Sequence, residues 1–489
     1  MVVGEYTASN IHMDEDAREE KKKTGIVDMT KLNADIATQK ELAAQGKLHE
    51  ALEGLLNLEK MSRLAEDITA AKASCSAVLE VCYQAKQWKL LEEQIMLLAK
   101  RRSQLKQAIQ AFVRQAMTYI DQTPDKETKV SLIKTLETVT EGKIFVEIER
   151  ARLTRKLAAI KEAEGNVAEA ADILQEVAVE TFGAMAKTEK IAFILEQVRL
   201  CLDKQDYIRA QILSRKISPK AFVEKKGEGK GEIGIEGTAI EEADVGIPSL
   251  PELKLSYYTL MIRYYGHYNN YLEMTRCYRA IYDMEAVQAE PDKWTAVLKK
   301  ICWFIALSPA YSTEGGSSSD HTTLLTLTQQ DKKLGSLPEY KALLETFANN
   351  EIIRWPVLHA QYQAEIAAQP DIFSEPKRLE DLKLRTIEHN VAVVAKYYTR
   401  ISTQRLSQLL DLSPADAEKH LADMVVSKAV AAKIDRPAGV VSFGKREAPE
   451  ELLNGWSSNI SKLLELVEKS CQQIQKECMR GGVTLGATA

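Results

Sequence analysis

The stretch TQRLSQLLDLSPADAEKHLADMVVSKAVAAKIDRPAGVVSF, residues 403–443, decides the fold of the later part of this 489-residue chain. It predicts a short helix and then a second helix after Ser413, because serine is a favoured N-cap and Pro414 suits the first helical position. Two alternating segments, 430–434 and 440–443, follow as strands joined by a turn rich in turn-forming residues. Two helices followed by a two-stranded wing predict a winged helix.

Before this module, the sequence shows a pattern of paired helices that recurs roughly every 40 residues. This period is typical of helical-repeat proteins. The segments GKLHEA (46–51) and GNVAEA (165–170) share letters as well as position in the period. Turn-forming residues recur at nearly even intervals, at Gly46, Gln87, Asp125, Gly165 and Asp206. Such a pattern indicates stacked helix pairs, which bury their apolar faces only against neighbouring pairs. We expect a right-handed, TPR-like solenoid; the alternative is an irregular all-helical domain with evenly spaced turns.

These patterns predict a mainly α-helical chain in five parts. Gly-rich and Pro-containing stretches interrupt the helical pattern twice within the array, which predicts two surface loops. The predicted parts are a flexible N-terminal tail (1–34), a helical-repeat array (35–378) with loops near 225–250 and 308–320, a winged-helix part (379–446), a C-terminal bundle helix (452–480) and a flexible tail (481–489).

Two candidate interaction sites follow from the last parts of the chain. The final helix carries an apolar stripe with 4-3-4-3-4 spacing, the pattern of a coiled-coil seam, formed by Ile460, Leu464, Val467, Cys471, Ile474 and Cys478. We expect this stripe to pack in a helical bundle with other chains, or alternatively against its own winged helix. The second site is the wing strand with Val440, Val441 and Phe443, which we expect to offer an edge for strand pairing.

Charge argues against nucleic acid, the second functional class that a winged helix raises. The net charge is −5, and residues 413–429 of the second helix carry three carboxylates against two lysines. A helix that reads a polyanion should be basic, and Arg436 in the wing is a single cation. A local basic patch, Lys100, Arg101, Arg102 and Lys106, fits a nuclear import signal, a contact to an acidic neighbour or a plain solvated face.

No apolar run approaches the roughly 18 residues that a membrane helix needs. The longest candidate, 301–307, is far too short, and segment 1–25 lacks the apolar centre of a secretory signal. Seven scattered cysteines with no CxxC pair fit core residues of an intracellular chain. We expect no membrane partner and a location in the cytoplasm and nucleus.

Catalytic and cofactor motifs are missing from the sequence or lie in the wrong setting. The segment GKGEIG (229–234) has the letters of a dinucleotide-binding motif, but it lies in a charged loop where that chemistry needs a strand and a helix. No GxxxxGK[ST], HExxH or GxSxG pattern occurs, and the seven histidines are far apart in the sequence. We expect no enzyme activity, no cofactor and no metal site.

The array and the winged helix together resemble the PCI-domain family, whose members are scaffolds of the proteasome lid, the signalosome and a translation initiation factor. Distinctive strings are most similar to the 26S proteasome lid branch of this family. They are VTEGKIFVEIERARLT (139–154), MLLAKRRSQLKQ (96–107), EHNVAVVAKYYTRI (388–401) and LLDLS (409–413). The similarity runs from about Leu42 to the final helix. The loop at 225–250 and the tail after Arg480 depart from the family pattern and leave the role of those segments open.

The resemblance implies a non-catalytic structural subunit of the proteasome lid, which serves ATP-dependent degradation of ubiquitinated proteins. It implies contacts between PCI domains, a bundle of terminal helices and a helical arm. The implied partners are other PCI lid subunits, a neighbouring metal-dependent deubiquitinase, the ATPase ring and the core particle. The alternatives are a scaffold of a sister PCI complex or a winged-helix nucleic-acid-binding protein.

Overall fold

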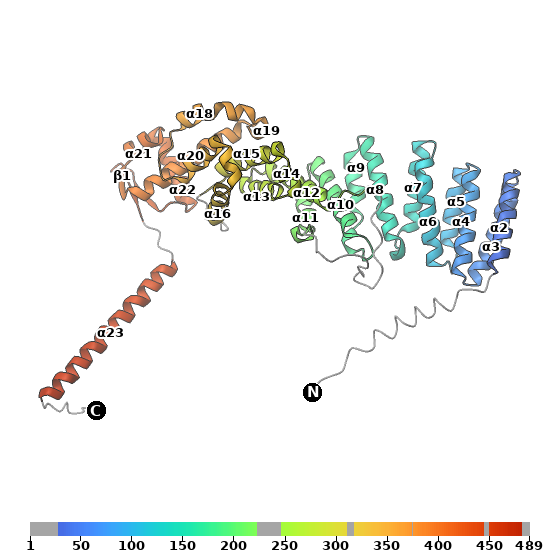
Figure 1. Ribbon diagram of the computed structural model, residues 1–489, viewed down its shortest axis with the longest axis horizontal. Helices are drawn as coiled ribbons and strands as arrows, with labels where there is room; N and C mark the ends of the chain where they lie inside the picture. Colours follow the sequence, from blue (N-terminus) through green and yellow to red (C-terminus); the bar gives the residue numbers. More distant parts are fainter. Residues whose placement is uncertain (1–27, 223–245, 311–316, 374, 445–448, 482–489) are drawn as a thin grey trace. The chain divides into compact units, whose positions relative to one another are not determined.

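The computed structural model describes residues 28–222, 246–310, 317–373, 375–444 and 449–481. In these residues the regular structure is almost entirely α-helix, with one small sheet (Figure 1). The chain divides into two compact units, residues 1–264 and 265–489. The predicted N-terminal tail and the Gly-rich loop lie largely outside the described residues, as do the centre of the second loop and the C-terminal tail.

The first unit contains consecutive helix pairs, which Figure 1 shows side by side. The second helices of these pairs begin at nearly even intervals along the chain, so the predicted helical repeat is confirmed. Its first helix begins at Met29, somewhat before the predicted start of the array. The pairs are α2 (Met29–Ala44) with α3 (Leu48–Leu64), α4 (Ile68–Gln84) with α5 (Trp88–Lys100), α6 (Lys106–Tyr119) with α7 (Lys126–Thr140), α8 (Glu147–Ala163) with α9 (Val167–Gln175), and α10 (Lys187–Asp203) with α11 (Tyr207–Arg215).

The predicted turn residues lie between the two helices of each pair. Gly46 and Gly165 have φ angles of 89° and 87°, a left-handed conformation that glycine adopts at low cost. Gln87, Asp125 and Asp206 are the N-cap residues of the second helices that follow them. In four of the five pairs a left-handed residue, Gly46, Lys86, Gly165 or Gln205, ends the first helix, and the turn before α7 has none.

One connected apolar core runs through the first four repeats. Buried residues from Leu32 to Leu157 form this cluster across α2 to α8. Ion pairs link neighbouring repeats at the same spacing, as between Lys40 and Glu80 at 2.6 Å and between Arg155 and Glu196 at 2.6 Å. Residues one repeat apart thus lie side by side, as expected for a stack of helix pairs.

The second unit begins near the end of α12 (Leu250–His267) and packs around α15 (Pro291–Leu307). Trp303 of α15 is fully buried and meets three aromatic rings edge-on, those of Tyr340, Tyr362 and Phe373. The other helices of this part are α13 (Tyr271–Tyr282), α14 (Glu285–Ala289), α16 (Ser317–Gln329), α17 (Pro338–Ala348), α18 (Trp355–Ala368), α19 (Pro370–Phe373) and α20 (Pro376–Tyr397).

The winged helix follows α20 with the predicted element order and one additional strand. Ser413 caps α22, accepting a hydrogen bond from the Asp416 amide at 3.2 Å, with Pro414 as the first helical residue. The added strand, β1, is too short to show an alternating pattern. The elements are β1 (Arg400–Ser402), α21 (Thr403–Leu410), α22 (Pro414–Val426), β2 (Ala432–Asp435) and β3 (Val440–Phe443).

The sheet is antiparallel in the order β1-β3-β2. Val441 of β3 lies opposite Ile401 on one side and Ile434 on the other. Val441 joins a core with Leu421 of α22 and Val391 of α20, all three fully buried. Helix α20 is therefore part of the module, and α23 (Pro449–Gly481) follows as the last element described.

Truncation of Leu421 tests this core. Leu421→Ala should lower the free energy of unfolding by about 2–5 kcal/mol, because it opens a cavity in a fully buried site. Val426→Ala on the same helix is the matched control; its side chain is 81% exposed, and its effect should stay within about 0.5 kcal/mol. Urea unfolding followed by circular dichroism measures both, and equal effects would contradict the core described here.

Candidate interaction surfaces

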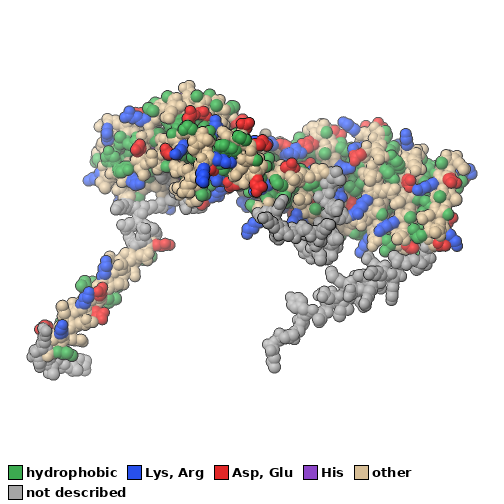
Figure 2. Space-filling view, viewed as in Figure 1, with side chains coloured by type: hydrophobic (Ala, Val, Ile, Leu, Met, Phe, Trp, Pro, Cys, Tyr) green, Lys and Arg blue, Asp and Glu red, His purple; other side chains and the backbone are tan. Residues whose placement is uncertain are grey.

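The apolar stripe of α23 is exposed to solvent along its length. Leu464 is 62% exposed, and Ile460, Val467 and Ile474 are also exposed. Cys471 is exposed and Cys478 is partly so. Figure 2 shows hydrophobic side chains along this helix between charged ones. A stripe of this size on a 33-residue helix is typical of a surface that a partner covers.

The structure extends this stripe beyond the predicted set. Trp456 is exposed one turn before Ile460 and Leu453 two turns before it, and Leu463 widens the stripe at its centre. Trp456 is 66% exposed and adds the kind of large aromatic side chain that carries binding energy in interfaces. Continuing the alternating spacing backwards from Ile460 reaches position 457 and then Leu453, so the sequence pattern could have found Leu453, whereas Trp456 lies one residue outside it.

The predicted edge strand is wrong, because β3 is the central strand of the sheet. Val441 is fully buried in the core, and Val440 and Phe443 are half-buried, with both sides of β3 occupied by β1 and β2. The sequence showed only two strands, so β3 was predicted to lie at an edge of the sheet. The structure adds the short strand β1, which pairs with the side of β3 that was expected to be free. The edges among the described strands are β1 and β2.

A groove of about 470 Å³ lies beside β2 and the end of α22. Val425, Val430 and Phe443 supply apolar lining, while Lys428 and Lys433 add positive charge. The half-buried Phe443 is thus the predicted wing residue that reaches this surface. The groove combines an apolar lining with an adjacent strand edge, which are the features that strand or helix addition requires.

The wing cation Arg436 is paired with a carboxylate. Arg436 donates from its Nε to Oε1 of Glu418 at 2.6 Å, so the wing cation is paired with a carboxylate of α22. Asp416 in the first turn of α22 adds negative charge at the end of the helix that would approach a groove in DNA.

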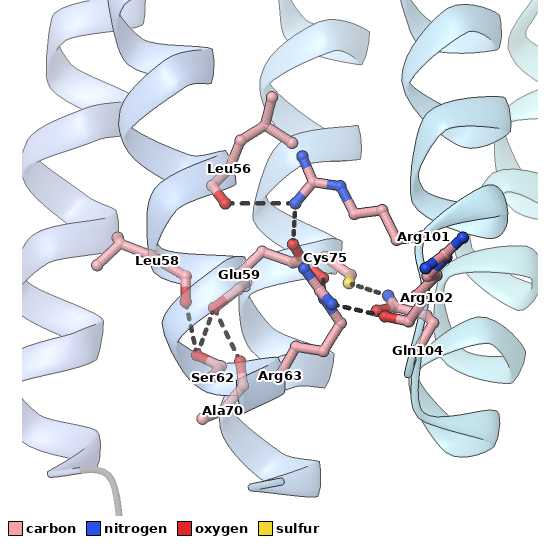
Figure 3. Close-up of polar contacts among 11 residues, drawn as sticks. Leu56, Leu58, Glu59, Ser62, Arg63, Ala70, Cys75, Arg101, Arg102 and Gln104 are labelled. Carbon is pink, nitrogen blue, oxygen red and sulfur yellow. Dashed lines mark hydrogen bonds and ion pairs between the residues drawn. The ribbon is translucent and has the colours of Figure 1, made fainter. Parts of the chain in front are cut away.

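A buried carboxylate joins the first two repeats. Glu59 of α3 is fully buried and accepts from Nε of Arg63 at 3.2 Å and from Arg101, which follows α5 (Figure 3). Arg63 also donates to the carbonyl of Arg102 at 2.6 Å, and Arg101 donates to the carbonyl of Leu56 at 3.5 Å. The cluster ties the C-terminal end of α3 to the turn between α5 and α6.

Two more buried glutamates bridge later repeats. Glu149 accepts from Arg114 at 2.6 Å, and Glu189 is held by Arg152 in a two-pronged pair at 2.8 and 2.9 Å. A buried pair of this kind penalises any shift that separates the charges, so it fixes the register of the stack. The strings at 96–107 and 139–154 contain Arg101, Glu149 and Arg152, which sequence reasoning had not connected to buried partners.

The structure brings two histidines together that are far apart in the sequence. His321 and His389 line a partly open cavity of about 20 Å³ with Arg385 and Glu388, which is room for about one water molecule. Their rings contact the backbone carbonyls of Ile305 at 3.2 Å and Glu351 at 3.1 Å, and burial lowers the pKa of both imidazoles. Both imidazoles thus contact backbone carbonyls beside this small cavity.

Among the described residues, no group of three or more His, Cys, Asp or Glu side chains is arranged to hold a metal ion. No helix in that part of the chain is both long and apolar enough to cross a bilayer. The segment GKGEIG (229–234) lies outside the described residues.

Comparisons with known proteins match nearly the whole chain. Residues 50–230 and 241–290 match the family model described as PSMD12/CSN4, N-terminal, and residues 350–445 match the PCI domain. Residues 450–480 match the 26S proteasome regulatory subunit RPN5 C-terminal domain, which is the α23 segment.

Curated relatives align over most of both chains. The 26S proteasome non-ATPase regulatory subunit 12 homolog A of Arabidopsis thaliana is 54% identical over 439 residues, covering 89% of this chain and 97% of the relative. Subunit 12 of Dictyostelium discoideum is 41% identical, covering 90% and 92%. The regulatory subunit RPN5 of Saccharomyces cerevisiae is 37% identical, covering 90% and 93%.

Removal of the charge at Glu59 should destabilise the array. Glu59→Gln should lower the free energy of unfolding by about 3–5 kcal/mol, because the neighbouring guanidinium groups lose the carboxylate that neutralises them. Glu50→Gln on the same helix removes a carboxylate in an exposed pair with Lys47 and should change stability by under about 0.5 kcal/mol. Urea denaturation measures the free energy of unfolding of both variants. Similar losses for both would argue against a stabilising role of the buried Glu59 ion pairs.

The exposed cysteine of α23 should react faster with a thiol reagent than the cysteines buried in the two compact units. Burial raises the pKa of Cys75, Cys82, Cys277 and Cys302 to about 12, so about one thiol in ten thousand is ionised at pH 8. Iodoacetamide at pH 8 should label exposed Cys471 first and these four scarcely at all. Mass spectrometry reads the sites, with urea-unfolded chain as the control; rapid labelling of Cys75 in the folded chain would be inconsistent with its burial.

Proposed function

Because this chain belongs to the family of 26S proteasome non-ATPase regulatory subunit 12, or RPN5, we propose that it scaffolds the regulatory particle through its PCI domain and α23. It is a non-catalytic PCI subunit of the lid. The observation that carries the scaffolding role is the exposed stripe of α23, which coincides with the matched RPN5 C-terminal domain. Its work is to hold other proteins in place while they degrade ubiquitinated substrates in an ATP-dependent process.

Helix α23 supplies the first contact, by packing its stripe in a bundle with terminal helices of other lid subunits. Ile460, Leu464, Val467, Cys471, Ile474 and Cys478 form the predicted face, extended by Leu453 and Trp456. The 3-4 spacing suits knobs-into-holes packing with parallel or antiparallel neighbours. Burial of a side chain the size of leucine contributes about 1.5–3 kcal/mol, so several together favour a stable bundle.

The winged helix supplies the second contact, through strand addition by a neighbouring PCI domain. We assign this role to the edge of β2, because β3 is already paired on both sides. The groove beside β2 gives the added segment an apolar surface that includes Phe443. Backbone hydrogen bonds from the edge supply affinity, and the groove supplies specificity.

The helical repeats supply the third contact, as an arm toward the ATPase ring, the core particle and the neighbouring metal-dependent deubiquitinase. Stacked helix pairs present large continuous surfaces, and the buried glutamate pairs keep those surfaces in fixed register. The family's place in the proteasome implies a location in the cytoplasm and nucleus, and no contact with nucleic acid or membrane.

Charge substitutions in the stripe test the bundle. Leu464→Asp or Ile474→Asp should block incorporation into the lid while leaving the isolated chain folded, because the carboxylate would be buried only in the bundle. Gln473→Asp on the same helix keeps the stripe intact and is the control for added charge. Native mass spectrometry of reconstituted lid reports incorporation, and circular dichroism reports folding.

If both stripe variants enter the lid normally, the proposed contact through α23 is wrong. A wild-type chain found only as a free monomer, in the presence of the other lid subunits, would overturn the scaffolding role itself. Loss of incorporation by the Gln473→Asp control would show that added charge alone accounts for the effect.

A further inference from the structure

A basic and apolar surface lies where the C-terminal end of α3 meets the turn between α5 and α6. Segments 60–66 and 97–106 contain six Lys and Arg residues and a single carboxylate, Glu66. Arg63 and Arg101 turn inward to Glu59. The remaining cations are exposed, and none of them forms an ion pair with another described residue: Lys60, Lys100, Arg102 and Lys106. We call these four cations and the apolar side chains among them the α3–α5 surface.

Hydrogen bonds hold the two segments of this surface together. The 2.6 Å bond from Arg63 to the carbonyl of Arg102 and the contact from Arg101 to Leu56 join α3 to the turn. Leu56, Lys60 and Arg63 occupy one helix face at spacings of four and three, so Lys60 lies beside the same turn. Figure 3 shows the Arg102 side chain pointing away from the Glu59 cluster and that of Arg101 pointing toward it.

Large apolar side chains flank these cations along the sequence of α3 and α5. Met61 and Leu64 at the end of α3 are 66% and 68% exposed, and Leu97 near the end of α5 is also exposed. Helices α3 and α5 are the second helices of consecutive repeats, so their C-terminal ends lie at the same end of the stack. Exposed apolar side chains within a charged rim are typical of a protein-binding surface.

The surface is also preorganised. The buried Glu59 cluster fixes the conformation of the turn, and Ser103 adopts a φ angle of 62° there. A partner would therefore meet a turn whose backbone is already fixed, which reduces the entropy lost on binding. An exposed basic patch on a plain solvated helix would lack this support.

We propose that the α3–α5 surface binds an acidic, amphipathic segment of a neighbouring subunit. Carboxylates of that segment pair with Lys100, Arg102 and the flanking lysines, while its apolar side chains cover Met61 and Leu64. A nucleic acid would satisfy the cations but would leave these apolar side chains exposed, so a protein segment fits better. The inference rests on the proposed scaffolding role, because the partner is another subunit of the same assembly.

Two measurements on the isolated full chain and on assembled lid test this proposal. Hydroxyl-radical oxidation of Met61 should fall about five-fold or more in the assembly, because interface cores exclude solvent. Carbodiimide, which couples amines to carboxylates at direct contacts, should link Lys60, Lys100 or Lys106 to an Asp or Glu of another subunit. Lys100→Glu with Arg102→Glu should abolish both signals, whereas Lys126→Glu with Lys134→Glu on exposed positions of α7 should preserve them.

Each result decides for or against the proposal. Unchanged oxidation of Met61 in a lid that contains the wild-type chain overturns the α3–α5 surface and leaves the scaffolding role intact. Protection of Met61 without carboxylate links, or protection that nuclease removes, overturns the acidic protein partner. Failure of the wild-type chain to enter the lid refutes the scaffolding role first, and the inference with it.

Discussion

A helix pair of this chain cannot bury its own apolar face, and that constraint governs the first unit. Each pair from α2 to α8 contributes to one connected core, so a repeat is stable only between neighbours. The chain forms successive helix pairs through similar turns, in most of which a left-handed residue ends the first helix and an N-cap residue begins the second. The result is a stack with more surface than a compact domain of equal length would offer.

Apolar packing alone would leave neighbouring repeats free to slide, and buried charge removes that freedom. Glu59, Glu149 and Glu189 each meet an arginine from the adjacent repeat. If one repeat shifted by a helical turn against its neighbour, a carboxylate would stay buried without its arginine, at a cost of several kcal/mol. This accounts for the distinctive strings at 96–107 and 139–154, whose arginines and glutamate complete these pairs.

The remaining surfaces are suited to holding proteins and unsuited to chemistry. Burial raises the pKa of the buried thiols, and it lowers the pKa of the two histidines that line the cavity of about 20 Å³. In contrast, α23 exposes a continuous apolar stripe, and β2 leaves a strand edge beside an apolar groove. These exposed apolar surfaces are where we propose that this non-catalytic lid subunit contacts its partners.

The sequence by itself determined the repeat period, the helices of the winged module, the cap at Ser413 and the stripe of α23, because periodicity and capping are local. Only the tertiary structure decided that β3 is central, since the short β1 pairs with a strand that comes after two helices and another strand. It alone showed that Arg101 points inward while Arg102 stays exposed, because burial of a charge depends on a partner one repeat away. Local pattern fixes the elements of this chain; contacts across repeats and strands decide which side chains are left for partners.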